Sequence, residues 1–249
     1  MDPILYTSAN GGGANFGRQT VIANNLANAN TTGFKSDIYE AQTMYVKSAG
    51  GANTYGQAFT TQNPNNVDFS AGAIVNTNRN LDVAVVNSNG WLAVQDTGGK
   101  EAYTKAGAFA INANGMLVTP SGKPVIGGGG PISVPPADSI IIGTDGTISI
   151  VPQGADPSAT TVIDRLKLVT LDNTAITKNT DGLFQLKSGS VAPADNNVTV
   201  VSGALEGSNV SPVDQMVSMI TSGRDFEINM NLMSTLNENL SKLSQVIHE

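Results

Sequence analysis

The chain has no cysteine and a single histidine, His248, among its 249 residues. Without cysteine there is neither a thiol nucleophile nor a disulfide. Such a sequence fits a reducing compartment, or an exported protein in which stray crosslinks would be harmful. One histidine excludes a multi-histidine metal site and argues strongly against a Ser-His-Asp triad. We therefore predict no catalytic, cofactor-binding or metal-binding residues.

Aromatic and charged side chains are also scarce. Aromatic residues make up 5% of the chain and charged residues 13%, and the net charge is −7. The 13 lysines and arginines are scattered singly, whereas nucleic-acid binding needs clustered cations that neutralise phosphates. Nucleic acid is therefore not an expected partner. The shortage of aromatics also argues against a carbohydrate cleft, although two of the 20 acidic residues could converge as a catalytic pair.

Long apolar runs are absent as well. No stretch of 18 apolar residues occurs, so we predict no membrane insertion. The first residues, MDPILYTSAN, lack the positive segment followed by an apolar segment that marks a cleavable signal peptide. If the protein leaves the cytoplasm, we expect another export route to carry it.

The two ends of the chain resemble each other in pattern, and the middle differs from both. Residues 2–30 and 212–248 carry apolar stripes at helical spacing, and each opens on a capping residue followed by proline. A triple glycine at 11–13 interrupts the first stripe. We expect a break or fraying there, because each glycine costs about 1 kcal/mol relative to alanine inside a helix.

Apolar residues of the C-terminal helix follow the spacing of a coiled-coil seam. From Met233 onward they recur in steps of 3, 4, 3 and 4 residues. The residues predicted to form this assembly surface are Phe226, Met230, Met233, Leu236, Leu240, Leu243 and Ile247. Packing against the N-terminal helix and neighbouring subunits is one interpretation, and packing on the chain's own β-rich part is the other.

Short strand-like segments separated by Gly and Asn turns fill the middle of the chain. Asn-Gly and Asp-Gly pairs supply the positive φ angles of tight hairpin turns. The predicted hairpin turns lie at 87–90, 96–99, 112–115 and 144–146. The tetraglycine at 127–130 is also a turn, because it lacks the lysine of a phosphate-binding loop. Strand spacing near ten residues predicts a barrel-like or sandwich-like all-β body.

These patterns divide the chain into three regions. We predict a discontinuous helical assembly module at 1–35 and 204–249, with coiled-coil-like packing. Residues 36–79 form a linker or extended region, in which Tyr39–Val46 fits either a strand or a continued helix. The all-β body spans 80–203. The predicted fold class is therefore mainly β with α-helical termini.

Two segments resemble the signatures of a known family. Residues 23–35, ANNLANANTTGFK, closely resemble the N-terminal signature A-N-N-L-A-N-x-x-T-x-G-F-K of the flagellar rod and hook family. Residues 203–210, GALEGSNV, resemble its C-terminal counterpart G-x-L-E-x-S-N-V. Both occur at the expected ends and in the expected order, so we identify the chain as a member of that family.

The resemblance extends over the whole chain. Residues 79–85 resemble the family's entry into the β domain, and residues 103–109 resemble its Y-T-R-x-G-x-F hairpin. Residues 90–95 and 224–227 are more similar to the proximal rod type than to the distal rod type. The distal type stays as the alternative within the family.

The resemblance implies a structural subunit of the bacterial flagellar basal-body rod, part of the axial drive shaft, and not an enzyme. The implied partners are other rod subunits, including the distal rod protein, or further copies of this chain, together with the flagellar type III export apparatus. The implied location is the rod that spans the periplasm. A secreted peptidoglycan-binding or carbohydrate-active protein is the alternative from another class.

Signature residues are implied to take part in subunit packing, with termination of the first helix as their alternative role. They are Asn24, Asn25, Leu26, Ala27, Asn28, Gly33, Phe34, Lys35, Leu205, Glu206, Ser208, Asn209 and Val210. Asparagine side chains can bond backbone groups at a helix end, a glycine permits the following turn, and a phenylalanine can anchor it.

Overall fold

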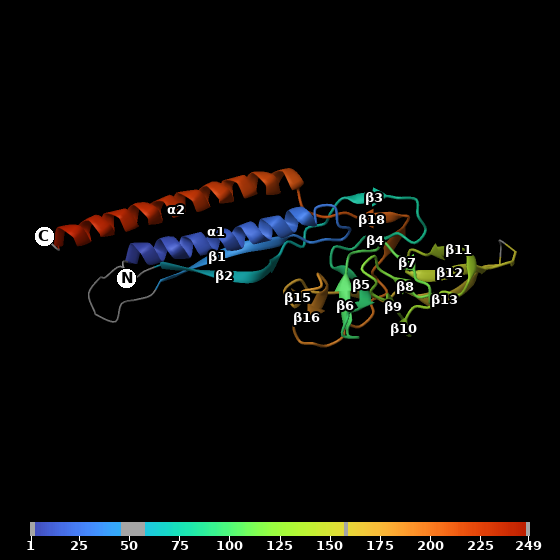
Figure 1. Ribbon diagram of the computed structural model, residues 1–249. Coiled ribbons are helices and arrows are strands. Elements are labelled where there is room, and N and C mark those ends of the chain that lie inside the picture. Colours follow the sequence, from blue (N-terminus) through green and yellow to red (C-terminus); the bar gives the residue numbers. More distant parts are fainter. Residues whose placement is uncertain (1–2, 46–57, 157–158, 248–249) are drawn as a thin grey trace. The chain divides into compact units, whose positions relative to one another are not determined.

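A computed structural model describes residues 3–45, 58–156 and 159–247 (Figure 1). The chain divides into two compact units. We call the first the helical unit; it comprises Met1–Ala27, Asp37–Asp68 and Ser211–Glu249. We call the second the strand unit; it comprises Asn28–Ser36 and Phe69–Val210.

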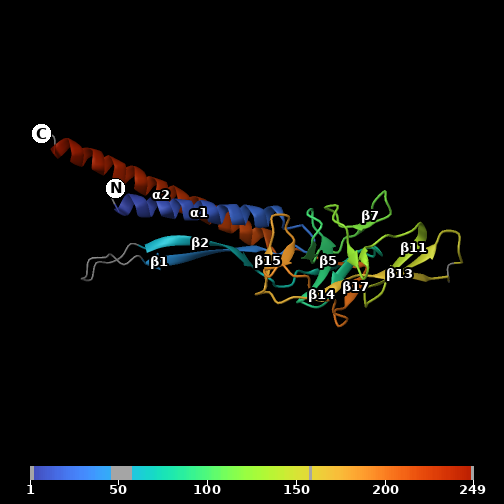
Figure 2. The ribbon, with the colours of Figure 1, turned by 90° about the horizontal axis from the view of Figure 1, so that it is seen from below.

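Two long helices and one hairpin build the helical unit. Helix α1 (Pro3–Ala27) contacts helix α2 (Pro212–Ile247), and the two run in opposite directions (Figure 1). Helix α1 also contacts strands β1 (Asp37–Tyr45) and β2 (Ala58–Val67), which form an antiparallel hairpin beside it (Figure 2). A bulge follows Ile38 in that hairpin.

The start of helix α2 agrees with the predicted capping pattern, and helix α1 begins at the predicted proline. Helix α1 begins at Pro3, and the predicted cap, Asp2, lies outside the described residues. Helix α2 begins at Pro212, and the backbone N–H of Asp214 donates to Ser211 Oγ at 3.4 Å. A serine side chain therefore accepts from one of the N–H groups that a helix leaves unpaired at its start.

The predicted break at the triple glycine is wrong, because α1 runs without interruption from Pro3 to Ala27. Contact with α2 supplies the physical reason. A Cβ built on Gly11 would lie 3.4 Å from Asn229 Oδ1, so the two helices approach closely there. Ser222, which is 1% exposed, donates from its Oγ to the carbonyl of Asn15 at 3.3 Å. This packing stabilises a helix that intrinsic propensity alone would leave marginal.

Short antiparallel strands build the strand unit. The largest sheet has the order β14-β5-β6-β16-β15, and a three-stranded sheet has the order β11-β12-β13. The other strands pair as β3 with β18, β4 with β17, β7 with β8 and β9 with β10. The strands are β3 (Ile74–Asn76), β4 (Val83–Val85), β5 (Gly90–Gln95), β6 (Glu101–Thr104), β7 (Ala110–Ile111), β8 (Leu117–Val118), β9 (Ile126–Gly127), β10 (Gly130–Pro131), β11 (Ala137–Ile142), β12 (Thr147–Pro152), β13 (Thr161–Arg165), β14 (Leu168–Thr170), β15 (Ile176–Lys178), β16 (Phe184–Leu186), β17 (Val200–Ser202) and β18 (Ala204–Glu206).

Most of the predicted hairpin turns are confirmed. Gly99, Gly115 and Gly146 have φ angles of 76°, 75° and 84°, and they connect β5 to β6, β7 to β8 and β11 to β12. The tetraglycine at 127–130 connects the paired strands β9 and β10. The predicted hairpin at 87–90 is wrong: β4 pairs with β17, whereas β5 pairs with β6 and β14. The partner of β4 arrives from far along the chain, so a turn signal alone did not identify it.

An apolar core fills the strand unit. Val83, Leu92, Val94 and Phe109 are fully buried and belong to one cluster contributed by most of the sheets. The prediction of a mainly β fold with an N-terminal and a C-terminal helix is confirmed. Within the described residues the strands form separate small sheets, so neither the barrel-like nor the sandwich-like form of the body is confirmed, and neither is coiled-coil-like packing of the helices.

The region predicted as linker or extended, residues 36–79, contains β1, β2 and β3. The segment that fitted either a strand or a helix is a strand as far as Tyr45, and Val46 lies outside the described residues. The domain boundaries drawn from the sequence stay a prediction.

Candidate functional site

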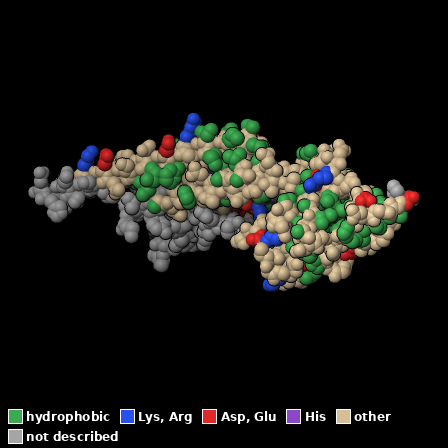
Figure 3. Space-filling view, turned by 45° about the vertical axis from the view of Figure 1, so that its right-hand side comes forward, with side chains coloured by type: hydrophobic (Ala, Val, Ile, Leu, Met, Phe, Trp, Pro, Cys, Tyr) green, Lys and Arg blue, Asp and Glu red, His purple; other side chains and the backbone are tan. Residues whose placement is uncertain are grey.

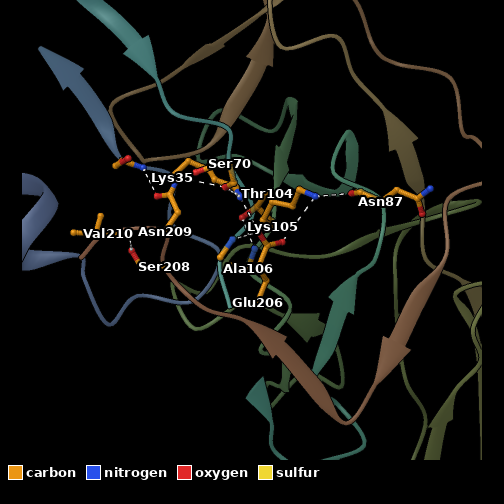
Figure 4. Close-up of polar contacts among 12 residues, drawn as sticks. Lys35, Ser70, Asn87, Thr104, Lys105, Ala106, Glu206, Ser208, Asn209 and Val210 are labelled. Atoms are coloured by element: carbon orange, nitrogen blue, oxygen red, sulfur yellow. Dashed lines mark hydrogen bonds and ion pairs between the residues drawn. The ribbon is translucent and has the colours of Figure 1, made fainter. Parts of the chain in front are cut away.

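The two signature segments meet inside the strand unit at a buried ion pair (Figure 4). Lys35 Nζ lies 2.7 Å from Glu206 Oε1 and also donates to the carbonyl of Ser70 at 2.6 Å. Lys35 is 2% exposed and Glu206 is 4% exposed. Residues 171 positions apart in the sequence are therefore joined by a charge-assisted hydrogen bond away from water.

A second buried lysine, just after β6, completes the cluster. Lys105 is 2% exposed, and its Nζ donates to the carbonyl of Asn87 at 2.8 Å. The same Nζ lies 3.9 Å from Glu206 Oε2 and 5.5 Å from the centroid of the Trp91 ring. We call Lys35, Lys105 and Glu206 the lysine–glutamate cluster.

The position of Lys105 changes its ionisation. Burial lowers the pKa of Lys105 to about 8, because the charged ammonium loses its hydration. Glu206 opposes this decrease and Lys35 adds to it. The folded chain therefore releases the Lys105 proton at a lower pH than the unfolded chain does.

This difference predicts a pH-dependent stability. Between about pH 8 and 10.5 the unfolded chain holds the Lys105 proton more than the folded chain does, so the free energy of unfolding rises with pH in that window. We expect a rise on the order of 1–3 kcal/mol, measured by urea denaturation. Lys105→Met should flatten it, whereas Lys100→Met, at an exposed lysine, should retain it. An unchanged rise in Lys105→Met would contradict the assignment.

Gly33 brings the N-terminal signature into contact with this cluster. Its φ of 67° is left-handed, and its N–H donates to the carbonyl of Glu206 at 2.8 Å. A Cβ on this residue would lie 2.3 Å from the backbone nitrogen of Ala106. Only glycine fits both the backbone angle and the space.

Asn209 of the C-terminal signature binds the other side of the same segment. Its Oδ1 accepts from the N–H of Ser36 at 2.8 Å, and its Nδ2 donates to the carbonyl of Ser70 at 3.3 Å. The Phe34 ring lies 4.2 Å from Lys178 Nζ, a cation–π contact. The segment that follows α1 is therefore held by side chains from distant parts of the chain.

Two signature asparagines form hydrogen bonds with residues close to them in the sequence, Asn25 with backbone groups and Asn28 with a side chain. In the helical unit, Asn25 is 3% exposed; its Nδ2 donates to the carbonyl of Asp37 at 2.9 Å, and its Oδ1 accepts from the Asp37 N–H at 2.9 Å. In the strand unit, Asn28 Oδ1 accepts from Thr31 Oγ1 at 3.1 Å. Asn25 thus fixes the first residue of β1, a role that neither helix termination nor subunit packing describes.

The other predicted site residues are not gathered at this site. Asn24 and Ala27 are exposed, Leu26 and Leu205 are half-buried, and Val210 is buried. Ser208 Oγ accepts from the N–H of Val210 at 3.2 Å.

The predicted seam residues lie on α2. Phe226 and Met230 are exposed there, and Met233 and Leu236 are half-buried. The side chains of Leu240, Leu243 and Ile247 lie outside the described residues, as does His248.

Sequence reasoning missed several members of the site. Lys105, Ser70 and Asn87 were not among the predicted residues. A signal existed only for Lys105, because it lies within residues 103–109, which resemble a family motif. Nothing in the sequence marks Ser70 or Asn87 as members of a site, because both contribute backbone carbonyls.

Two further observations concern the described part of the chain. It contains no group of three or more His, Cys, Asp or Glu side chains placed to hold a metal ion. None of its helices is both long and apolar enough to cross a membrane. Fold and site together define a class of protein: a mainly β chain whose two signature segments are joined by buried polar contacts and whose terminal helices pair.

Comparison with known proteins identifies that class. Three family models match: "Flagella basal body rod protein" over residues 5–35, "Flagellar hook protein FlgE/F/G D1 domain" over 85–150, and "Flagellar basal body rod FlgEFG protein C-terminal" over 201–246. The flagellar basal-body rod protein FlgF of Salmonella typhimurium is 37% identical over 99% of both chains. FlgF of Escherichia coli is 36% identical over 99% of both.

The chain belongs to the flagellar basal-body rod protein family. Its resemblance to the FlgF form, the form expected from the sequence, is confirmed by these matches. FlgG of Bacillus subtilis, a basal-body rod protein of the other form, is 32% identical over 90% of both chains.

Proposed function

We propose that this chain is a structural subunit of the flagellar basal-body rod, of the proximal rod type, and that it assembles through its terminal helices. It is not an enzyme. The observation that carries the proposal is the sequence identity of 36–37%, over 99% of the chain, to proteins named as flagellar basal-body rod proteins. No second function is favoured by a contact or cavity of the described residues.

Exposed apolar side chains on α2 support assembly through the helical unit. Figure 3 shows hydrophobic side chains grouped along the helices. The exposed members on α2 are Val213, Met216, Val217, Ile220, Phe226, Ile228, Met230 and Leu232. Val213, Val217 and Ile220 are four and three residues apart, so they share one face of the helix. An exposed apolar face of this kind, which here covers residues 213–220, marks an interaction surface.

The predicted coiled-coil seam is a second apolar stripe of α2, because at about 100° per residue Leu236, Leu240 and Leu243 lie roughly opposite the face of Val213, Val217 and Ile220. Under the proposal, the module of residues 1–35 and 204–249 packs with coiled-coil-like contacts against other subunits, and a sandwich-like body of residues 80–203 lies outside that contact. Leu240, Leu243 and Ile247 continue the seam. The signature residues act in assembly indirectly, by fixing the segment between α1 and β1.

The partners under this proposal are other rod subunits, including the distal rod protein, and further copies of this chain. The protein reaches the periplasm-spanning rod through the flagellar type III export apparatus. The absence of cysteine from the sequence supports such a route, because an unfolded chain without thiols cannot form disulfide crosslinks during export.

Charges placed on the α2 face test the proposal. Val217 and Ile220 are each 59% exposed, so the double variant Val217→Asp with Ile220→Asp should leave the purified chain folded. Burying these two side chains between subunits contributes about 3–6 kcal/mol. We therefore expect incorporation into isolated basal bodies, and swimming, to be lost in cells that carry this variant as their only copy. Leu240→Asp extends the same assay to the seam.

The strand unit offers a matched control. Val162 is 63% exposed and Ile141 is 50% exposed, so Val162→Asp with Ile141→Asp introduces the same charges at equally exposed aliphatic positions. This variant should still enter the rod. Normal incorporation of the α2 variant would refute assembly through this face, and the unchanged far-UV spectrum and melting temperature of both variants would show that folding is not the cause.

A further inference from the structure

A small cavity borders the lysine–glutamate cluster. Its volume is about 60 Å³, and its lining includes Lys35, Lys105 and Glu206 together with Ser88. One water molecule occupies about 30 Å³ in the liquid, so the cavity has room for a monatomic ion or two waters. Ser88 and its neighbour Val86, which also lines the cavity, are exposed, so solvent can reach it.

The charges around the cavity do not balance. Lys35 and Glu206 form a close pair at 2.7 Å and neutralise each other. Lys105 lies 3.9 Å from the same carboxylate, which already has its partner. The titratable groups that act on Lys105 among the described residues are Glu206 from β18 and Lys35 from the segment before β1. Two cations and one anion leave an excess of one positive charge in a buried place.

The hydrogen-bond donors do not balance either. A lysine ammonium has three donors. Lys35 uses two of them, on Ser70 and Glu206. Within the described residues Lys105 uses one, on Asn87, because its distance of 3.9 Å to Glu206 is too long for a hydrogen bond. Buried donors are costly to leave without acceptors.

We propose that this cavity binds one small monovalent anion of halide size, held by Lys105 Nζ beside Lys35, with the hydroxyl of Ser88 at the entrance. A water molecule would accept from the free donors but would leave the excess charge in place. A monatomic anion accepts from the same donors and neutralises that charge, which makes it the better occupant.

The single tryptophan of the chain provides the readout. Trp91 is 1% exposed, and its ring centroid lies 5.5 Å from Lys105 Nζ. Bromide quenches indole fluorescence as a heavy atom. A bromide ion bound in the cavity should therefore quench Trp91 to a plateau when sodium bromide replaces sodium gluconate at constant ionic strength. Neutral acrylamide should quench this buried ring weakly and without a plateau.

Three variants of the full chain assign the effect. Lys105→Met removes the proposed anion-binding cation, and Ser88→Asp places a negative charge at the exposed entrance without disturbing the core. Each variant should raise the bromide concentration that gives half-maximal quenching about ten-fold or more. Lys100→Met, which removes an exposed cation elsewhere, should behave like the parent chain. If Lys105→Met does not fold, Ser88→Asp still tests whether the cavity binds the anion.

The pH provides an independent arm. A bound anion favours protonated Lys105, whose pKa is lowered to about 8, so bromide should bind more weakly at pH 9.5 than at pH 7. Saturable quenching that weakens in both variants and at high pH would establish the site. Linear quenching without a plateau, equal in the parent and the variants, would overturn it and show that the cavity holds water only.

Discussion

Lys35→Met is expected to lower the free energy of unfolding by about 3–5 kcal/mol, because it removes one partner of a buried ion pair and leaves the other without it. Glu206 would lose its contact at 2.7 Å and keep Lys105 at 3.9 Å as its cationic neighbour, together with the hydrogen bond from the Gly72 N–H at 3.1 Å. The carbonyl of Ser70 would also lose its donor. Urea denaturation of the purified chain at neutral pH measures the loss.

A surface pair with the same geometry is the control. Lys123 Nζ also lies 2.7 Å from a carboxylate, that of Asp181, but these side chains are 13% and 33% exposed. Exposed pairs contribute about 0–1 kcal/mol, so Lys123→Met should have a small effect. If both variants lost the same free energy of unfolding, burial would not be the reason why the Lys35–Glu206 pair stabilises the fold.

Gly33→Ala is expected to destabilise the strand unit by about 2–6 kcal/mol, from backbone strain and overpacking together. The φ of 67° is unfavourable for alanine, and its Cβ would lie 2.3 Å from the backbone nitrogen of Ala106. Neither the turn nor the opposing backbone can yield without disturbing the hydrogen bond from Gly33 to Glu206. The loss is measured from the midpoint and slope of urea unfolding.

Gly182→Ala separates the two contributions. Gly182 has a φ of 77°, close to that of Gly33, but a Cβ there would meet nothing within 4 Å. Its substitution should therefore cost only the backbone strain, about 1–2 kcal/mol. If both substitutions cost the same, the close approach of Gly33 to Ala106 contributes nothing to stability.

The sequence predicts those parts of the fold that depend on neighbouring residues. The proline at the start of each helix and the glycines at 99, 115 and 146 act within a few positions, and the structure confirms them. The prediction from the triple glycine was wrong because the helix there depends on packing against α2, where Asn229 lies 218 positions after Gly11. Propensity describes an isolated helix, whereas α1 is stabilised by its packing partner.

The site was predictable only as two separate segments. Their resemblance to family signatures marks Gly33, Lys35, Glu206 and Asn209, yet no local pattern shows that they contact one another. The carbonyls of Ser70 and Asn87 leave no trace in residue type. Lys105 could have been suspected from its motif, but its burial depends on how β5, β6 and β18 pack.

The order in which these contacts can form follows from where their members lie in the chain. Residues 28–36 belong to the strand unit, but their partners at 206 and 209 are among the last residues of that unit to be synthesised. Contacts of such long sequence separation form slowly, because loop closure must precede them. In a chain synthesised from its N-terminus, the N-terminal signature therefore cannot form its contacts with Glu206 and Asn209 until most of the chain has been made.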